Sequence, residues 1–368
     1  MNTQKTPVYF YLPDVYWQAS NQLSSMLDNY LNGFIKLGDL WEWHVDTHPG
    51  LKSDGLFAWI ILPYLCLKSR KFECELVDKI PKQGIVILPR KFVEDDLKPS
   101  PQCLFVMIKY DAKIHSYSQI HVVQNPQDEL ILQNSSLWKN HYISHYLQPG
   151  LLPRNSQNGD RFQNLAFFGL EENLAPELKT NEWIDQLKSL GYNWSIINRK
   201  KWYDYSDVDA VIAVRSFDSR SYDVKPASKL YNSWQAGVPA ILGAESSFRA
   251  ERNSELDYIE VTSPEQIITA LESLRTNPDL RQKMIENGKQ RSQQKLPDIV
   301  TQQWINFLEN KAFSEYEKWL SLPKYGQQLY FISRDNSENL KEVNAKIRRI
   351  KGTVKNTLKQ YLGNILNV

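Results

Sequence analysis

The sequence predicts an α/β protein with two doubly wound parallel sheets. Short apolar segments recur along the first 261 residues of the chain. Segments with helical spacing lie between them, and glycines or prolines mark many of the junctions. Continuously apolar strands are typical of parallel sheets, because helices cover both faces of such a sheet. The chain, with 368 residues, is long enough for two domains of this kind.

The alternation of strands and helices is clearest between residues 158 and 300. Helices are predicted at 182–190 and 227–236, where Gly191 and Gly237 end them. Ser263 provides the cap of a further helix, with a proline at its first position. We therefore assign 158–300 to one Rossmann-like domain. Its predicted strands are 165–170, 194–197, 208–214, 238–243 and 257–261.

Residues 1–150 show the same alternation. Helices are predicted at 19–36 and 56–70. The segment 148–159 is rich in proline, glycine and asparagine, which is typical of a connection between domains. We expect 1–150 to form a second Rossmann-like domain. Its predicted strands are 8–12, 41–45, 73–77, 84–88, 104–108 and 120–123.

Two further helices are predicted after residue 300. The first, 301–322, carries an aromatic face and is expected to pack across the domains. The second, 323–368, has apolar residues at helical spacing, with nine Lys or Arg against three Asp or Glu. Two interpretations stay open for this basic amphipathic helix. It packs on the first domain or a second subunit, or it lies on an anionic membrane surface.

The composition argues against several classes of protein. The 44 Lys and Arg and 42 Asp and Glu leave a net charge of +2, so no bulk charge indicates nucleic-acid binding. Three cysteines do not make a disulfide framework. The most apolar segment, 56–67, is too short to span a bilayer, and the first residues lack a signal-peptide pattern. We expect a cytoplasmic protein, and any contact with a membrane would be a peripheral one.

Several residues follow predicted strands of the 158–300 domain. In an open parallel sheet, ligands bind beyond the carboxyl ends of the strands. A single arginine after a strand is usually a surface residue, but similar features at successive strand ends of one sheet favour a shared site. Ammonium groups near a helix N-terminus favour phosphate or diphosphate. The candidate residues are Gly169, Arg215, Lys225, Ser228, Lys229, Glu245 and Ser246.

The segment 225–243 resembles the donor-binding segment of glycosyltransferases with the two-Rossmann-domain, or B-type, fold. Residues 236–241, Ala-Gly-Val-Pro-Ala-Ile, match the end of a helix and the strand that frames a nucleotide-sugar in that family. The resemblance implies two domains that face each other across a cleft. It also implies that Arg215, Lys225 and Lys229 neutralise the donor diphosphate without a bound metal or other cofactor.

One departure from the family pattern concerns the contacts to the sugar. Retaining members often carry two glutamates eight residues apart before this glycine, whereas this sequence has Val224 and Asn232. The resemblance makes Asn232 a candidate to hydrogen-bond a ribose hydroxyl. Asp223 and Glu245 are the nearest carboxylates that could take over a glutamate role.

The 1–150 domain is expected to bind a hydroxyl acceptor, either a glycan, a lipid-linked compound or a small molecule. The turn-rich segment 48–55 follows the predicted strand 41–45 and corresponds to a loop that faces the donor phosphates in the family. His48 and Asp54 of this segment are candidate general bases toward the acceptor. The spacing of His44 and His48 would suit a metal only on a helix, so no metal site is predicted.

The resemblance thus implies a glycosyltransferase of the hexosyltransferase class that uses a nucleotide-sugar. Two alternatives stay open. A sugar-nucleotide epimerase of the same fold would change the sugar without an acceptor. A catalytically degenerate scaffold protein would bind the nucleotide-sugar without transferring it.

Overall fold

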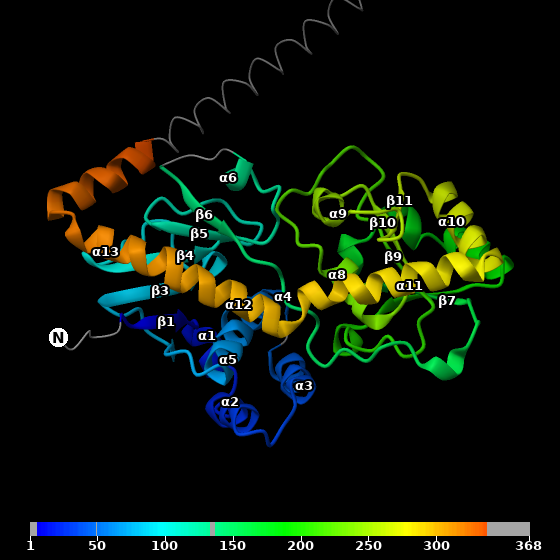
Figure 1. Cartoon of the computed structure of the whole chain (residues 1–368), viewed down its shortest axis with the longest axis horizontal. Coiled ribbons are helices and arrows are strands. Elements are labelled where there is room, and N and C mark those ends of the chain that lie inside the picture. Colours follow the sequence, from blue (N-terminus) through cyan, green and yellow to red (C-terminus); the bar gives the residue numbers. More distant parts are fainter. Residues whose placement is uncertain (1–5, 49, 133–136, 337–368) are drawn as a thin grey trace, which may run out of the picture.

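The computed structural model describes residues 6–336, apart from residues 49 and 133–136. Two lobes lie side by side, each built around one sheet (Figure 1). All pairings between the described strands are parallel. This confirms the predicted α/β class with two Rossmann-like domains.

The sheet of the first domain has six described strands in the order β2-β1-β3-β4-β5-β6. Strands β3 and β4 form its centre, paired from Gln83 with Gln102 to Pro89 with Ile108. Strand β6 was not predicted, because its sequence Lys-Asn-His-Tyr is polar and only half-buried at the edge of the sheet. The strands are β1 Val8–Tyr11, β2 Glu75–Val77, β3 Gln83–Pro89, β4 Gln102–Ile108, β5 Ile120–Val123 and β6 Lys139–Tyr142.

The helices of the first domain correct one prediction. Residues 41–45 are not a strand but part of α3, Leu37–Thr47. The short run Trp-Glu-Trp-His-Val suits a strand locally, but residues 40, 41, 44 and 45 are the ones buried, which is the spacing of a helix. The helical segments are α1 Asp14–Gln18, α2 Leu23–Leu31, α3, α4 Leu51–Leu56, η1 Phe57–Ile61, α5 Leu62–Ser69, η2 Arg90–Phe92 and α6 Glu129–Leu132.

The second sheet has five described strands in the order β11-β10-β9-β7-β8, each at a predicted position. Gly237 ends α8 in the left-handed region, with φ 70°, as its predicted role requires. The strands are β7 Asn164–Phe168, β8 Asn193–Ile197, β9 Ala210–Ala213, β10 Ala240–Gly243 and β11 Ile259–Val261. The longer helices are α7 Asn181–Ser189, α8 Ser228–Ala236, α9 Ser246–Glu251, α10 Pro264–Thr276 and α11 Pro278–Ser292. The short turns are η3 Ser156–Asn158, η4 Glu171–Asn173, η5 Pro176–Lys179, η6 Arg199–Lys201 and η7 Gln293–Lys295.

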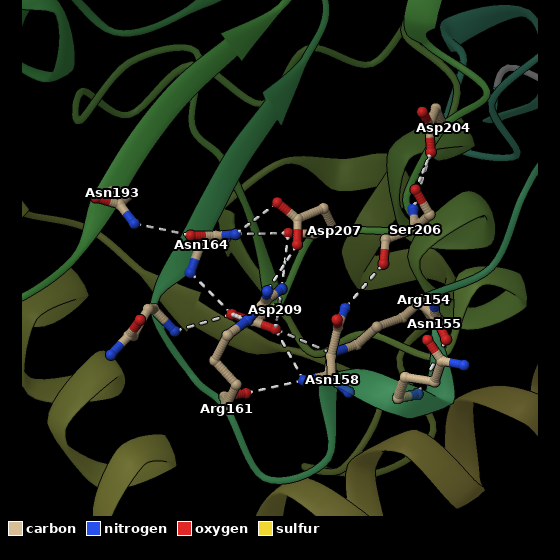
Figure 2. A network of polar contacts seen from close by, with 12 residues as sticks. Arg154, Asn155, Asn158, Arg161, Asn164, Asn193, Asp204, Ser206, Asp207 and Asp209 are labelled. Carbon is tan, nitrogen blue, oxygen red and sulfur yellow. Dashed lines mark hydrogen bonds and ion pairs between the residues drawn. The ribbon is translucent and has the colours of Figure 1, made fainter.

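The connection between the domains is tied to the second sheet by the buried carboxylate of Asp209 (Figure 2). Asp209 accepts hydrogen bonds from Arg154 Nε at 3.0 Å and Arg161 Nε at 3.1 Å. The backbone N–H groups of Gln163 and Asn164 also donate to it. Burial alone would raise the pKa of Asp209, but these hydrogen bonds hold it below its usual range. The network therefore fixes the point where the chain enters the second domain.

The chain returns to the first domain after α11 (Figure 1). Helix α12, Pro297–Phe307, continues through η8, Leu308–Ala312, into α13, Phe313–Ser321. Trp304, Phe307 and Trp319 are buried in the core of the first domain. Residues 324–336 are helical, and the rest of the predicted basic helix, 337–368, lies outside the described residues. No helix within the described ranges is long and apolar enough to cross a bilayer.

Candidate functional site

A cavity of about 300 Å³ lies between the two domains. Its second-domain wall is formed by the segments that follow β7 and β9 and by the start of α8. Its first-domain wall is formed by α4, η1 and the segments that follow β3, β4, β5 and β6. Seven of the ten predicted site residues line the cavity: Asp54, Gly169, Arg215, Lys225, Ser228, Lys229 and Asn232. The other three, His48, Glu245 and Ser246, do not.

The parallel register explains why the second-domain residues meet. Phe168 pairs with Ile197, and Leu242 of β10 pairs with Ala213 of β9, so the strands end at the same edge of the sheet. Gly169 follows β7 directly. A Cβ atom at this position would lie 2.9 Å from the Phe167 ring and 3.2 Å from Lys229 Cε. The absence of a side chain therefore leaves the room that Lys229 occupies.

Lys229 differs from the other cations of the site in its ion pairing and in its pKa. Among the residues that the structure describes, it forms no ion pair. Its ammonium lies 5.4 Å from the centre of the Phe167 ring. Burial, together with the positive charges of Arg215 and Lys225, lowers the pKa of Lys229 to about 7, although Glu245 opposes the shift. A partly buried ammonium without a carboxylate partner favours an anionic ligand.

Arg215 is held in one orientation by two partners. Its Nε donates to Glu245 Oε2 at 3.0 Å, and its Nη1 donates to Asn173 Oδ1 at 2.8 Å. Glu245 is buried behind Arg215 and outside the cavity, so its contact is with the arginine. Ser246 Oγ accepts a hydrogen bond from Asn125 Nδ2 at 3.0 Å, a contact between the domains.

Lys225 is paired across the cleft. Its Nζ lies 2.5 Å from Asp111 Oδ2 of the first domain, and Lys91 also pairs with that carboxylate. Burial opposes ionisation of Asp111, but the two ammonium groups outweigh it and hold the pKa of Asp111 well below its usual range. Asp111 is thus ionised at neutral pH and is a weak base.

Asp54 lines the cavity but is held by an ion pair across the cleft. Arg199 of η6 donates from Nε to Asp54 Oδ2 at 2.9 Å. His44 Nε2 donates to Asp54 Oδ1 at 2.9 Å, and Tyr16 donates its hydroxyl to His44 Nδ1. Neither Arg199 nor His44 was predicted to belong to the site. Arg199 is 145 residues from Asp54 in the sequence, and no local pattern relates the two.

His48 is buried and lies outside the cavity. Its ring stacks on Tyr16 at 3.8 Å, and its Nε2 donates to the Tyr16 carbonyl at 3.1 Å. This placement follows from the corrected element before it. Because 41–45 belongs to a helix, residue 48 ends that helix and does not follow a strand of the sheet.

The first-domain wall includes a wide turn of helix. Segment η1 is wound as a π-helix, in which the Leu62 N–H bonds to the Phe57 carbonyl five residues earlier. Pro63 accounts for the π-helical winding. A proline has no N–H to donate, and its ring crowds the carbonyl four residues before it. Phe57 and Trp59 of this segment line the cavity.

His145 lines the cavity and was not predicted as a site residue. Its Nδ1 lies 2.7 Å from the Tyr146 carbonyl, which can only accept, so the neutral ring carries its proton on Nδ1. The lone pair then lies on Nε2. Burial lowers the pKa of His145, and the positive charge of Lys229 lowers it further. The hydrogen bond to the Tyr146 carbonyl acts in the opposite direction and raises it. Its position after β6 was the available signal, but β6 itself was not predicted.

The part of the chain that the structure describes holds no group of three or more His, Cys, Asp or Glu arranged for a metal ion.

Comparisons with known proteins find similarity among solved structures. No protein-family model and no curated protein matches the chain. Among solved structures, it is similar to a sucrose-phosphate synthase from Thermosynechococcus elongatus, with 11% identity and a TM-score of 0.43 over 63% of this chain and 74% of that one. It is also similar to Anabaena Alr3699/HepE in complex with UDP, with 9% identity and a TM-score of 0.47 over 71% and 97%.

A third similar structure is the pneumococcal O-GlcNAc transferase GtfA in complex with UDP and GlcNAc. The identity is 12% and the TM-score 0.45, over 72% of this chain and 60% of the length of that one. Two parallel-sheet domains on either side of a cavity are the architecture that the resemblance to B-type glycosyltransferases predicts.

Proposed function

We propose that this protein is a glycosyltransferase that moves a sugar from a nucleoside-diphosphate donor to a hydroxyl acceptor. One observation carries the proposal: Arg215, Lys225 and Lys229 converge at the strand ends of the second sheet, on a cavity between the domains. Ligands of open parallel sheets bind at this edge. The cations suit a diphosphate, and the opposite wall leaves a place for the acceptor.

The donor diphosphate would contact Lys229 first. Lys229 forms no ion pair with the described carboxylates, whereas Lys225 and Arg215 already have Asp111 and Glu245 as partners. A diphosphate gains negative charge as its bond to the sugar breaks, and fixed cations stabilise that charge in the transition state. We propose that these three side chains supply this stabilisation without a metal ion.

We propose that Asn232 contacts the sugar or the ribose of the donor. Its Oδ1 accepts a hydrogen bond from the Gln148 N–H at 3.0 Å, which fixes the orientation of the carboxamide. The Nδ2 group lies near the Tyr205 hydroxyl and is the donor that a ligand hydroxyl would meet. We propose this contact in place of the glutamate pair that the sequence lacks, with the Ser228 hydroxyl beside it at the start of α8.

His145 is the general base that the geometry favours. In the transfer, the acceptor oxygen bonds to the anomeric carbon, and the bond from that carbon to the diphosphate oxygen breaks with its electrons on the diphosphate. His145 Nε2 takes the proton of the acceptor hydroxyl. Its lowered pKa keeps the ring neutral, so the Nε2 lone pair is available at neutral pH. Asp54 instead holds the two domains together through Arg199.

The experiment is an incubation with a panel of uridine, guanosine, adenosine and thymidine diphosphate sugars, followed by analysis of the released nucleotide and of the sugar product. We expect release of nucleoside diphosphate from at least one donor. The sugar should appear as a glycoside when a hydroxyl acceptor is present and as free sugar when none is. Conversion to an epimeric sugar without acceptor would favour an epimerase. Binding with neither product would favour a non-catalytic protein.

A further inference from the structure

Three charged side chains at the cavity form a cluster that joins the two domains. Asp111 of the first domain pairs through its Oδ2 with Lys225 of the second domain, at 2.5 Å. Its other oxygen, Oδ1, pairs with Lys91 of the first domain. All three residues line the cavity. Because the two ammonium groups use different oxygens of one carboxylate, one of them can leave Asp111 while the other stays.

The first sheet explains why Lys91 and Asp111 are neighbours. Strands β3 and β4 are paired in parallel up to Pro89 and Ile108, so the segments that follow them begin at the same edge of the sheet. Lys91 lies in η2, directly after β3, and Asp111 lies in the turn that follows β4. The pair between them therefore depends on the first domain alone, whereas the pair with Lys225 needs both domains.

Asp111 is the fixed member of the cluster. The preceding residue, Tyr110, has a φ of 54°, in the left-handed region that residues with a side chain rarely adopt. Tyr110 is buried, and its hydroxyl donates to the Gly55 carbonyl at 3.1 Å. Burial and this hydrogen bond hold the turn that carries Asp111. Lysines have long flexible side chains, so Lys91 and Lys225 are the partners that can move.

The charges of the cluster suit an exchange of partners. One carboxylate and two ammonium groups leave a net charge of +1 at this side of the cavity. If Lys225 turns to a diphosphate, Lys91 still compensates the charge of Asp111. Without Lys91, an uncompensated carboxylate would remain next to the bound diphosphate, and the two anions would repel each other.

We propose that Asp111 takes the place of the donor diphosphate in the empty site, that Lys225 passes from Asp111 to the donor, and that Lys91 is the positioning residue that compensates Asp111 after this exchange. The inference rests on the proposed function, because it requires a diphosphate in the cavity. It adds that the direct ion pair between the domains at Asp111 is replaced when the donor binds.

The test is a calorimetric titration of UDP, GDP, ADP and dTDP, in about 0.1 M salt so that distant charges are screened. Lys91→Met should bind the nucleotide about three- to fivefold more weakly than the wild type, because Asp111 then holds Lys225 alone. Lys91→Arg should bind like the wild type, since a guanidinium also pairs with the carboxylate. Lys98→Met is the control, because it removes an exposed lysine of the first domain outside the cavity.

A double-mutant cycle separates this role from a direct contact between Lys91 and the nucleotide. In the background of Asp111→Asn no carboxylate remains to compensate, so Lys91→Met should then change the affinity by less than about twofold. An equal loss in both backgrounds would overturn the assigned role, as would an unchanged affinity of the single variant Lys91→Met. A wild type that binds none of the four nucleotides would overturn the donor site itself, so the two failures are distinguishable.

Discussion

The two walls of the cavity differ in how their charges are compensated. On the second-domain wall, Lys229 has no carboxylate partner among the described residues. On the first-domain wall, both carboxylates have cationic partners in the opposite domain, Asp54 in Arg199 and Asp111 in Lys225. One wall therefore has a positive charge to offer an anionic ligand, and the other uses its charges to hold the cleft together.

The largest effect is expected from a substitution that removes the proposed base from the first-domain wall. His145→Ala is expected to lower the rate of transfer by roughly 10²- to 10⁴-fold. Binding of nucleoside diphosphate should change little, because the diphosphate contacts the opposite wall. Steady-state rates of the variant give the effect on transfer, and calorimetric titration of the same variant gives the effect on nucleotide binding. His141→Ala is the control, since His141 packs on Phe307 outside the cavity. Equal losses in both variants would remove His145 from the proposed role.

The pH dependence of binding tests the charge on the second-domain wall. The pKa of Lys229 is about 7 without ligand, so the ammonium is protonated below pH 7 and loses its proton above it. An anion at the site raises this pKa, and binding above pH 7 must then take up a proton. The affinity for nucleoside diphosphate should fall as pH rises from 7 to 9, by at most about tenfold per pH unit.

The control for this pH dependence is Lys229→Arg, since a guanidinium keeps its charge over the whole range. Its affinity should be nearly constant between pH 7 and 9. Proton uptake is measured independently by calorimetry in buffers of different ionisation enthalpy. A wild-type affinity that does not change with pH would contradict a titrating Lys229 at the binding site.

The smallest effect is expected from a substitution that breaks the ion pair between Asp111 and Lys225 across the cleft. Asp111→Asn removes the carboxylate that competes with a diphosphate for Lys225. Both side chains are partly exposed, so the gain in affinity should be modest, about two- to fivefold. Titration of the variant with nucleoside diphosphate gives the value. A loss of affinity would mean that Asp111 assists the ligand and does not compete with it.

The second-domain wall was predictable from the sequence because its residues follow strands directly. Each of the five strands is a short apolar run, and Arg215 and Gly169 come within two residues of a strand end. The parallel register then brings such residues together without any information on distant contacts. Lys225 and Lys229 precede and begin the helix that Gly237 ends.

The first-domain wall was predictable only in part, since it depends on contacts between distant residues. The run at 41–45 is too short to distinguish a strand from a buried helix. His145 follows an edge strand whose polar sequence gives no strand signal. The partner of Asp54 comes from the other domain. The network around Asp209 was not predictable for the same reason, because Asp209 and Arg154 are 55 residues apart in the sequence.

The most direct test of the account is a calorimetric titration of UDP, GDP, ADP and dTDP into wild-type protein and Lys229→Met. At least one nucleoside diphosphate should bind the wild type. The variant should bind it roughly 10- to 100-fold more weakly, because a charge-assisted contact is lost. Lys188→Met, which removes an exposed lysine of α7, should bind like the wild type. Absence of binding by all four nucleotides, or equal affinity of Lys229→Met, would contradict a diphosphate site at the strand ends of the second domain.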